Sequence, residues 1–210
     1  MTLANFEMLQ PPAFDNPFCT RRVRPGAIPF RFPDGDSAEQ LLDRLRANQW
    51  RGAIVGPHGS GKSTLLATLE PLLVNAGRDV RRVTLRDRQR TLPKGFFHYG
   101  TLNDTTLAMV DGFEQLGCLS RWMLLVKCYS RGSGLLVTAH KPVHLPEVFR
   151  PAPSLEVAQQ LSRELLSTCD ERIEITDSDI AAAFARHPDN LRETLFALYD
   201  LFESRKTLLR

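Results

Sequence analysis

The 210-residue sequence has little cysteine, and none of its four cysteines lies close to another along the chain. They are Cys19, Cys118, Cys128 and Cys169. Such isolated positions fit neither a zinc site nor a disulfide framework, so we expect reduced and mostly buried thiols. The five histidines show no ligand pattern either, because Pro142 separates His140 from His144 and breaks a shared helical face.

Long hydrophobic runs are also missing. No run of about 18 or more apolar residues occurs, which argues against a membrane span. The N-terminus lacks a basic start followed by an apolar core, so we expect no secretory signal and a cytoplasmic protein. The length and the hydrophobic fraction of 42% are typical of one globular domain, with or without a small appendage.

The most informative stretch is IVGPHGSGKSTLL, residues 54–66, which fits G-x-x-x-x-G-K-[ST] between a strand pattern and a helix pattern. Its glycines let backbone N–H groups turn inward around an anion, and the following helix N-terminus adds partial positive charge. We expect Lys62 to reach the β- and γ-phosphates of ATP and Ser63 to ligate Mg²⁺. The expected nucleotide-binding residues of this loop are Gly56, Pro57, His58, Gly59, Ser60, Gly61, Lys62, Ser63 and Thr64.

A second acidic residue at the metal is expected at the end of a neighbouring strand. The segment TLAMVD, residues 106–111, is an apolar run that ends in Asp111. Its carboxylate is predicted to hold Mg²⁺ through water, opposite Ser63. The alternative is that Asp111 caps the N-terminus of the next helix.

Four apolar segments predict strands: 51–56, 79–85, 106–111 and 134–140. Helices are predicted from Ser37, over 62–75 and around 114–131, with Gln40 completing a capping box at the first of them. Strands that alternate with helices pair in parallel through right-handed crossovers. The predicted fold is therefore α/β, a parallel sheet flanked by helices.

The last part of the chain is helical in pattern and follows the prolines at 151–153. Amphipathic segments begin at Ser154 and Thr176 and continue to the end of the chain, and Asp179 has capping-box spacing from Thr176. We predict three parts: an extended arm (1–35), an α/β core (36–150) and a C-terminal helical subdomain (151–210).

Three further motifs resemble those of STAND-type NTPases, relatives of the AAA+ ATPases. Asp111-Gly-Phe-Glu114-Gln resembles their D-G-x-[DE] motif, and GLLVTAH resembles their sensor strand, with His140 where an arginine often stands. Asp189-Asn-Leu-Arg192 resembles their G-N-x-R lid segment, with aspartate replacing glycine. In motif order the resemblance covers roughly residues 50–205, and it implies an ATP-binding core with a helical lid. Neither an arginine-finger motif nor an ABC-type signature occurs, so oligomeric assembly stays open.

The resemblance implies a role for each of these residues. Many such ATPases place a water-polarising glutamate directly after the aspartate, where this chain has Gly112. Glu114 would then orient the water if the chain bends at Gly112, His140 would sense the γ-phosphate, and Arg192 would reach across from the lid. The structural alternatives are a solvated residue in a first helical turn, a histidine satisfied at a strand end and a helix-surface ion pair.

The function that these motifs favour is an Mg²⁺-dependent ATP-binding protein and ATP hydrolase of AAA+/STAND-like type, acting as a nucleotide-dependent switch or loader. Its partner would be an unidentified protein, without a membrane. One alternative is a small-molecule kinase whose lid arginines would be Arg86, Arg88 or Arg90. The other is a module that binds ATP without significant turnover.

Two basic segments suggest additional contacts. The run RRVTLRDRQR (81–90) holds five arginines and could meet nucleic acid, although such runs are more often solvated strand edges. The arm NPFCTRRVRPGAIPFRF (16–32) could supply an adenine pocket from its arginine and phenylalanine planes. Packing along the sheet edge is the alternative for the arm.

Overall fold

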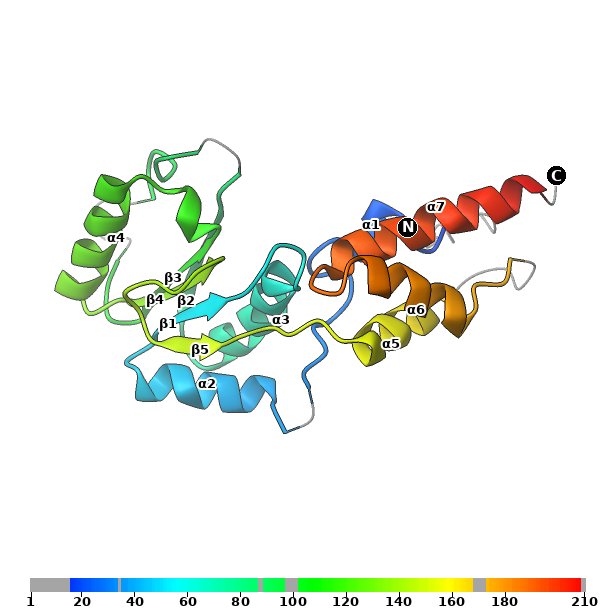
Figure 1. Ribbon diagram of the computed structural model, residues 1–210. Helices are drawn as coiled ribbons and strands as arrows, with labels where there is room; N and C mark the ends of the chain where they lie inside the picture. The colour runs from blue at the N-terminus through cyan, green and yellow to red at the C-terminus, as the bar shows by residue number, and fades with distance from the viewer. Residues whose placement is uncertain (1–15, 34, 87–88, 97–101, 168–172, 209–210) are drawn as a thin grey trace, which may run out of the picture.

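The computed structural model describes residues 16–33, 35–86, 89–96, 102–167 and 173–208. Its centre is a parallel five-stranded sheet in the order β2-β3-β4-β1-β5 (Figure 1). The strands are β1 (Arg51–Val55), β2 (Asp79–Thr84), β3 (Thr106–Asp111), β4 (Gly134–Ala139) and β5 (Glu147–Phe149). The predicted α/β class is confirmed, and the arrangement is consistent with a P-loop NTPase fold.

The order of the strands corrects one expectation from the sequence. The strand that ends in Asp111 is not next to the P-loop strand, because β4 lies between β3 and β1 and pairs with both. All strands are parallel, so their carboxyl ends still meet at one edge of the sheet. Asp111 and the loop after β1 therefore lie at the same edge, with β4 bridging them.

Alternate residues of the buried strands pack against opposite layers. The helices lie on both faces of the sheet (Figure 1). Helices α2 (Ala38–Ala47) and α3 (Lys62–Asn75) cover one face with their leucines. Helix α4 (Cys118–Ser130) covers the other face through Leu124 and Cys128. Because both faces are buried, β3 and β4 are near-continuous apolar runs.

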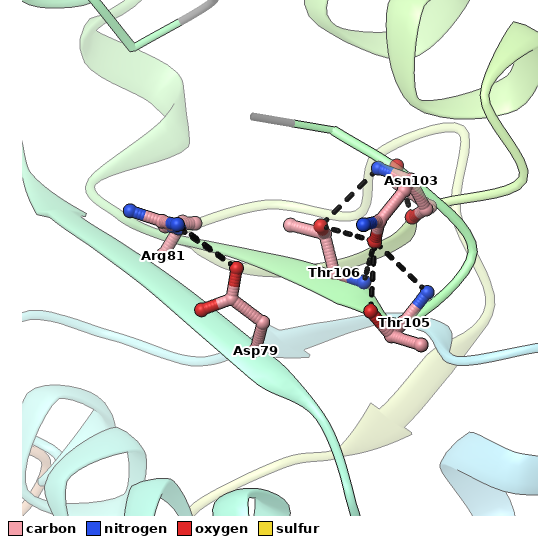
Figure 2. A network of polar contacts seen from close by, with 6 residues as sticks. Asp79, Arg81, Asn103, Thr105 and Thr106 are labelled. Atoms are coloured by element: carbon pink, nitrogen blue, oxygen red, sulfur yellow. Dashed lines mark hydrogen bonds and ion pairs between the residues drawn. The ribbon is translucent and has the colours of Figure 1, made fainter. Parts of the chain in front are cut away.

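The side chain of Asn103 fixes the start of β3 (Figure 2). Its Oδ1 accepts hydrogen bonds from the backbone N–H and the hydroxyl of both Thr105 and Thr106. The Asn103 carbonyl accepts from the Ser133 hydroxyl at 2.8 Å, just before β4. These bonds join the amino-terminal ends of β3 and β4. They thereby fix the position of Asp111, at the carboxyl end of β3, relative to β4.

The helix starts agree with the predicted caps, with one difference. Thr176 forms the predicted capping box with Asp179. Backbone N–H groups of Gln40 and Val157 donate to the Ser37 and Ser154 hydroxyls, so of the box predicted at Ser37 only this half is formed. These side chains satisfy N–H groups that have no partner within the helix.

The helix predicted around 114–131 starts later than expected. A 3₁₀ turn η1 (Phe113–Gln115) comes first, and the chain is extended at Leu116 and Gly117 before α4 begins at Cys118. The Gly117 N–H donates to the Arg90 carbonyl at 2.9 Å, which holds this segment against the loop after β2. The expectation of mostly buried cysteines was also wrong, because Cys118 is exposed and Cys19 only partly buried; Cys169 lies outside the described residues.

Helices α5 (Leu155–Leu166), α6 (Asp177–Arg186) and α7 (Leu191–Leu208) form a separate apolar cluster, at the end of the molecule opposite α4 (Figure 1). The described part of the arm includes a short helix, α1 (Thr20–Val23), and it inserts Phe18 fully into that cluster. The division into three parts stays a prediction. Among the described residues, no helix is both long and apolar enough to cross a membrane.

Candidate nucleotide-binding site

The P-loop joins the end of β1 to the start of α3 at the carboxyl edge of the sheet. Gly59 and Gly61 have φ angles of +70° and +93°, a region that favours glycine because it has no Cβ. Backbone in which left-handed and right-handed conformations alternate can direct successive N–H groups into one concave anion site. The loop therefore has local geometry suited to phosphates, as the motif predicts.

Lys62 is the first residue of α3 and is only 8% exposed. Its ammonium donates to the carbonyl oxygens of Gly56 at 2.8 Å and Pro57 at 2.6 Å. Burial lowers the pKa of Lys62, whereas the carboxylates of Glu114 and Asp111 act to raise it. The structure thus places the lysine charge between the loop and both predicted acids.

Asp111 is 7% exposed and held by a residue of the intervening strand. The Thr138 hydroxyl donates to Asp111 Oδ1 at 2.7 Å and accepts from the Gly112 N–H at 2.8 Å. Asp111 does not cap a helix, since Gly112 occupies the position before η1. The pattern analysis missed Thr138, although a hydroxyl in an otherwise apolar strand was a usable signal.

Glu114 pairs with His140, the residue directly after β4. Glu114 Oε1 lies 2.6 Å from His140 Nε2, with side chains 27% and 23% exposed. Burial lowers the pKa of His140; the Glu114 carboxylate opposes this shift, and the charges of Lys62 and His58 add to it. The Nε2 atom of His140 thus faces the Glu114 carboxylate in a partly buried pair.

His58, in the middle of the P-loop, stacks on this pair. The ring centroids of His58 and His140 lie 3.6 Å apart with a tilt of 32°. The contact joins the loop to the end of β4 and, through His140, to Glu114. Three residues predicted separately from the sequence thus form one connected group, and Glu114 is not the solvated residue of the structural alternative.

The residues at this edge fit a nucleotide with Mg²⁺. Ser60 Oγ, in a residue only 2% exposed, and Glu114 Oε2 are buried and without a hydrogen-bond partner in the part of the chain that the structure describes. Buried polar atoms of this kind normally have a partner, and a bound ligand or water could supply one. Ser63 and Asp111 would hold Mg²⁺ through oxygen ligands, and Thr64 follows Ser63 in the first turn of α3.

The C-terminal part of the chain contacts the P-loop at Asn190, the residue just before α7. The Asn190 side chain lies against Gly59 so closely that a Cβ on this glycine would be 1.7 Å from Asn190 Oδ1. That same oxygen accepts from the Glu193 N–H at 3.2 Å at the start of α7. Arg192 is exposed, and its charge lowers the pKa of Lys62. The contact of Asn190 was not predicted, although the residue belongs to the Asp189–Arg192 motif.

The arginine run and the arm have different surroundings. Arg81 pairs with Asp79, and Arg82 pairs with Glu70 at 2.9 Å, so two of its five charges have acidic partners. Arg86 and Arg90 are exposed, and Arg88 lies outside the described residues. In the arm, the Phe30 N–H donates to the Thr68 hydroxyl of α3 at 2.9 Å, which places the arm beside the helix that the P-loop starts.

Comparisons with known proteins find partial and distant similarities. No protein-family model matches the chain. The chain is 45% identical over 76 residues to ABC transporter G family member 1 of Petunia hybrida, a match that spans 35% of this chain and 12% of that protein. A solved structure of C. elegans PCH-2 is similar at 14% identity and a TM-score of 0.35, over 81% of this chain and 67% of that one. The sheet order and the loop geometry, rather than this similarity, are consistent with a nucleotide-binding P-loop NTPase.

Proposed function

We propose that this protein binds ATP with Mg²⁺ and hydrolyses it as an AAA+/STAND-like nucleotide-dependent switch or loader. The observation that carries the proposal is the Glu114–His140 pair, at 2.6 Å, beside the buried Lys62 and Asp111. A phosphate-binding loop, a metal-side acid and a candidate general base thus lie at one edge of the sheet. This set is what phosphoryl transfer to water requires.

Each residue has a distinct task in this proposal. Lys62 leaves the carbonyls of Gly56 and Pro57 to neutralise charge on the β- and γ-phosphates. Ser63 and Asp111 hold Mg²⁺, which supplies charge stabilisation at the phosphates when bound. Thr138 keeps the Asp111 carboxylate oriented by donating to Oδ1.

Glu114 accepts a proton from the attacking water in this scheme. His140 donates from Nε2–H to Oε1 and keeps the carboxylate in one orientation, so that Oε2 is left for the water. Because His58 of the P-loop stacks on His140, a change in the loop can reach Glu114 through two side chains. His140 is therefore a positioning residue for the base as well as a candidate γ-phosphate sensor.

The C-terminal helices act as the lid in this proposal. Asn190 already contacts the P-loop at Gly59, and Arg192 stands two residues farther along. Movement of α7 would therefore change both the loop and the position of one cation. The arm supplies one side of the adenine pocket, as its position along α3 favours.

Calorimetry with Mg²⁺-ATP tests the binding step. Lys62→Ala should bind ATP markedly more weakly than the wild type, because the variant lacks the cation under the loop. Arg46→Ala, a cation on the outer side of α2, is the matched control and should keep the wild-type affinity. Equal ATP affinity for Lys62→Ala and the wild type would remove the assignment.

A binding module without turnover is the second candidate, and one observation favours it. The 2.6 Å contact with His140 occupies one carboxylate oxygen of Glu114, the candidate base. Assays of ADP and free phosphate, with and without an added acceptor, separate the candidates. Steady release of free phosphate without an acceptor supports the hydrolase, ADP formation that needs a small-molecule acceptor supports a kinase, and ATP binding without ADP formation supports the module.

A further inference from the structure

Helix α4 exposes a continuous row of large apolar side chains on its outer side. Leu119, Trp122 and Tyr129 are 71%, 62% and 53% exposed, and Met123 and Val126 are 37% and 44% exposed. The opposite side of the same helix is buried on the sheet through Leu124 and Cys128. A helix that is apolar on both sides is normally covered on both sides. We call these five exposed residues the α4 outer row.

The spacing of the α4 outer row suits a partner helix. Each member lies three or four residues from another member, and together they occupy an arc of roughly 120° on the helix. Ridges with this spacing pack into the grooves of a second helix. Tryptophan, tyrosine and methionine are also the residue types enriched at protein interfaces.

Positive charge lies beside the α4 outer row. The Arg51 guanidinium lies over the Tyr129 ring, 3.9 Å from its centroid, and so adds a cation at one edge of the row. Lys127 follows Met123 by four residues and borders the row on its other side. Helix α4 itself carries no acidic residue. The surface is therefore apolar along its middle, with a cation at each edge.

We propose that the α4 outer row is a docking surface for an amphipathic helix of a partner protein that carries acidic residues beside its apolar stripe. The charge of the surface selects this occupant. A second copy docked through the same face would bring the Arg51 and Lys127 cations of the two copies close together. Two cations at the row also fall short of the four to eight that typically hold a segment on anionic lipid.

Docking at this place would lie close to the candidate base. Arg121, on α4, donates from its guanidinium to the carbonyl oxygens of Glu114 and of Leu116, the latter at 2.7 Å. A partner that shifts α4 would therefore move the turn that carries Glu114. The docking itself does not depend on ATP hydrolysis, and this lets the two proposals fail separately.

Fluorescence anisotropy with two labelled peptides tests the docking. Both are helices of about 20 residues with leucine at i, i+3, i+4 and i+7; one has glutamate beside the stripe and the other lysine. The full-length wild-type protein should bind the acidic peptide at least about tenfold more tightly than the basic one. Leu119→Ser and Trp122→Ser should each weaken the acidic peptide by about tenfold or more.

Val74→Ser is the matched control, because Val74 is an apolar residue on α3 with 53% exposure and lies outside the row. It should leave the affinity for the acidic peptide unchanged, as should a Lys62→Ala variant that no longer binds ATP. Circular dichroism melts of the Leu119, Trp122 and Val74 variants should coincide with the wild type, since these three side chains are exposed. Lys127→Glu should reduce the preference for the acidic peptide.

Three results would overturn the proposal. Equal binding of both peptides, or binding that Leu119→Ser does not change, would show that the row does not select an acidic helix. Sedimentation of the protein with phosphatidylserine vesicles that requires Trp122 would assign the surface to a membrane. Self-association in ultracentrifugation that Leu119→Ser abolishes would assign it to a second copy.

Discussion

Replacing Gly59 with alanine tests whether the C-terminal helices rest on the P-loop. Gly59 has φ +70°, and a Cβ there would lie 1.7 Å from Asn190 Oδ1, 2.5 Å from Cγ and 3.2 Å from Nδ2. These are the three nearest atoms, and all belong to the Asn190 carboxamide. Alanine at position 59 can therefore be accommodated only if that carboxamide moves.

The size of the effect follows from two contributions. A left-handed conformation costs alanine about 1–2 kcal/mol relative to glycine. Displacing the carboxamide also breaks its bond to the Glu193 N–H at the start of α7, and loss of such a cap costs about 1 kcal/mol. Gly59→Ala should therefore destabilise by about 2–3 kcal/mol and Asn190→Ala by about 1 kcal/mol.

The double variant gives the coupling free energy between positions 59 and 190. Asn190→Ala removes the clashing atoms and the cap, so Gly59→Ala then adds only its backbone cost. The double variant should be about as destabilised as Gly59→Ala alone, which leaves a coupling of about 1 kcal/mol. Urea unfolding of the four proteins, followed by circular dichroism, measures it.

Gly77→Ala is the matched control for this cycle. Gly77 has φ +82°, but a Cβ there would meet nothing within 4 Å. Its effect should add to that of Asn190→Ala without coupling. If the effects of Gly59→Ala and Asn190→Ala are additive to within about 0.5 kcal/mol, Asn190 does not rest on the P-loop and the lid proposal loses its contact.

Three further predictions concern the base, the lid and the arginine run. Glu114→Gln should keep its ATP affinity, while its rate of phosphate release falls by about 10²–10⁴-fold. Asp111→Asn should also weaken the Mg²⁺-dependent ATP binding measured by calorimetry. Phosphate release by Glu114→Gln at the wild-type rate would place the base elsewhere. The Arg205 hydrogen bonds, with smaller contributions from Thr176, hold the pKa of Asp179 at about 2, below its usual 3.8. These contacts stabilise the fold by about 2 kcal/mol above pH 4, and this is lost as the pH falls towards 2. Arg205→Met should reduce that acid dependence of urea unfolding, and an unchanged profile would contradict this. If the run 81–90 binds nucleic acid, gel-shift affinity should fall steeply with salt, and salt-independent binding or none at low salt would refute this contact.

Local signals in the sequence were sufficient for most of the elements. The strand ending at Asp111 has the predicted limits, 106–111, because six consecutive buried positions leave an apolar run that turns polar at both ends. The helix over 62–75 also has its predicted limits, fixed by the loop before it and by Gly77 after it. Caps and apolar runs act over a few residues, and sequence patterns report them directly.

The order of the strands needed information that local patterns do not hold. Strand β5 has only three residues and follows Pro146, which leaves too few positions for a recognisable alternation. It pairs with β1, about 90 residues earlier in the chain, and so adds an edge strand that was not expected. The position of β4 between β1 and β3 likewise depends on packing across the sheet, not on any one segment.

The candidate base shows how a departure from the usual motif and a contact between distant segments combine. Glycine at 112 has φ +85°, and a Cβ there would lie 2.9 Å from the Leu85 carbonyl, so a glutamate could not occupy this position in the same conformation. The chain bends at Gly112, as the sequence suggested, and η1 then presents Glu114 to His140 from β4. Glu114 lies two residues beyond the usual position of the glutamate, on the separate turn η1. A contact from another segment is therefore needed to fix the orientation of its carboxylate. His140 supplies that partner, which explains in physical terms why histidine stands at the end of this strand.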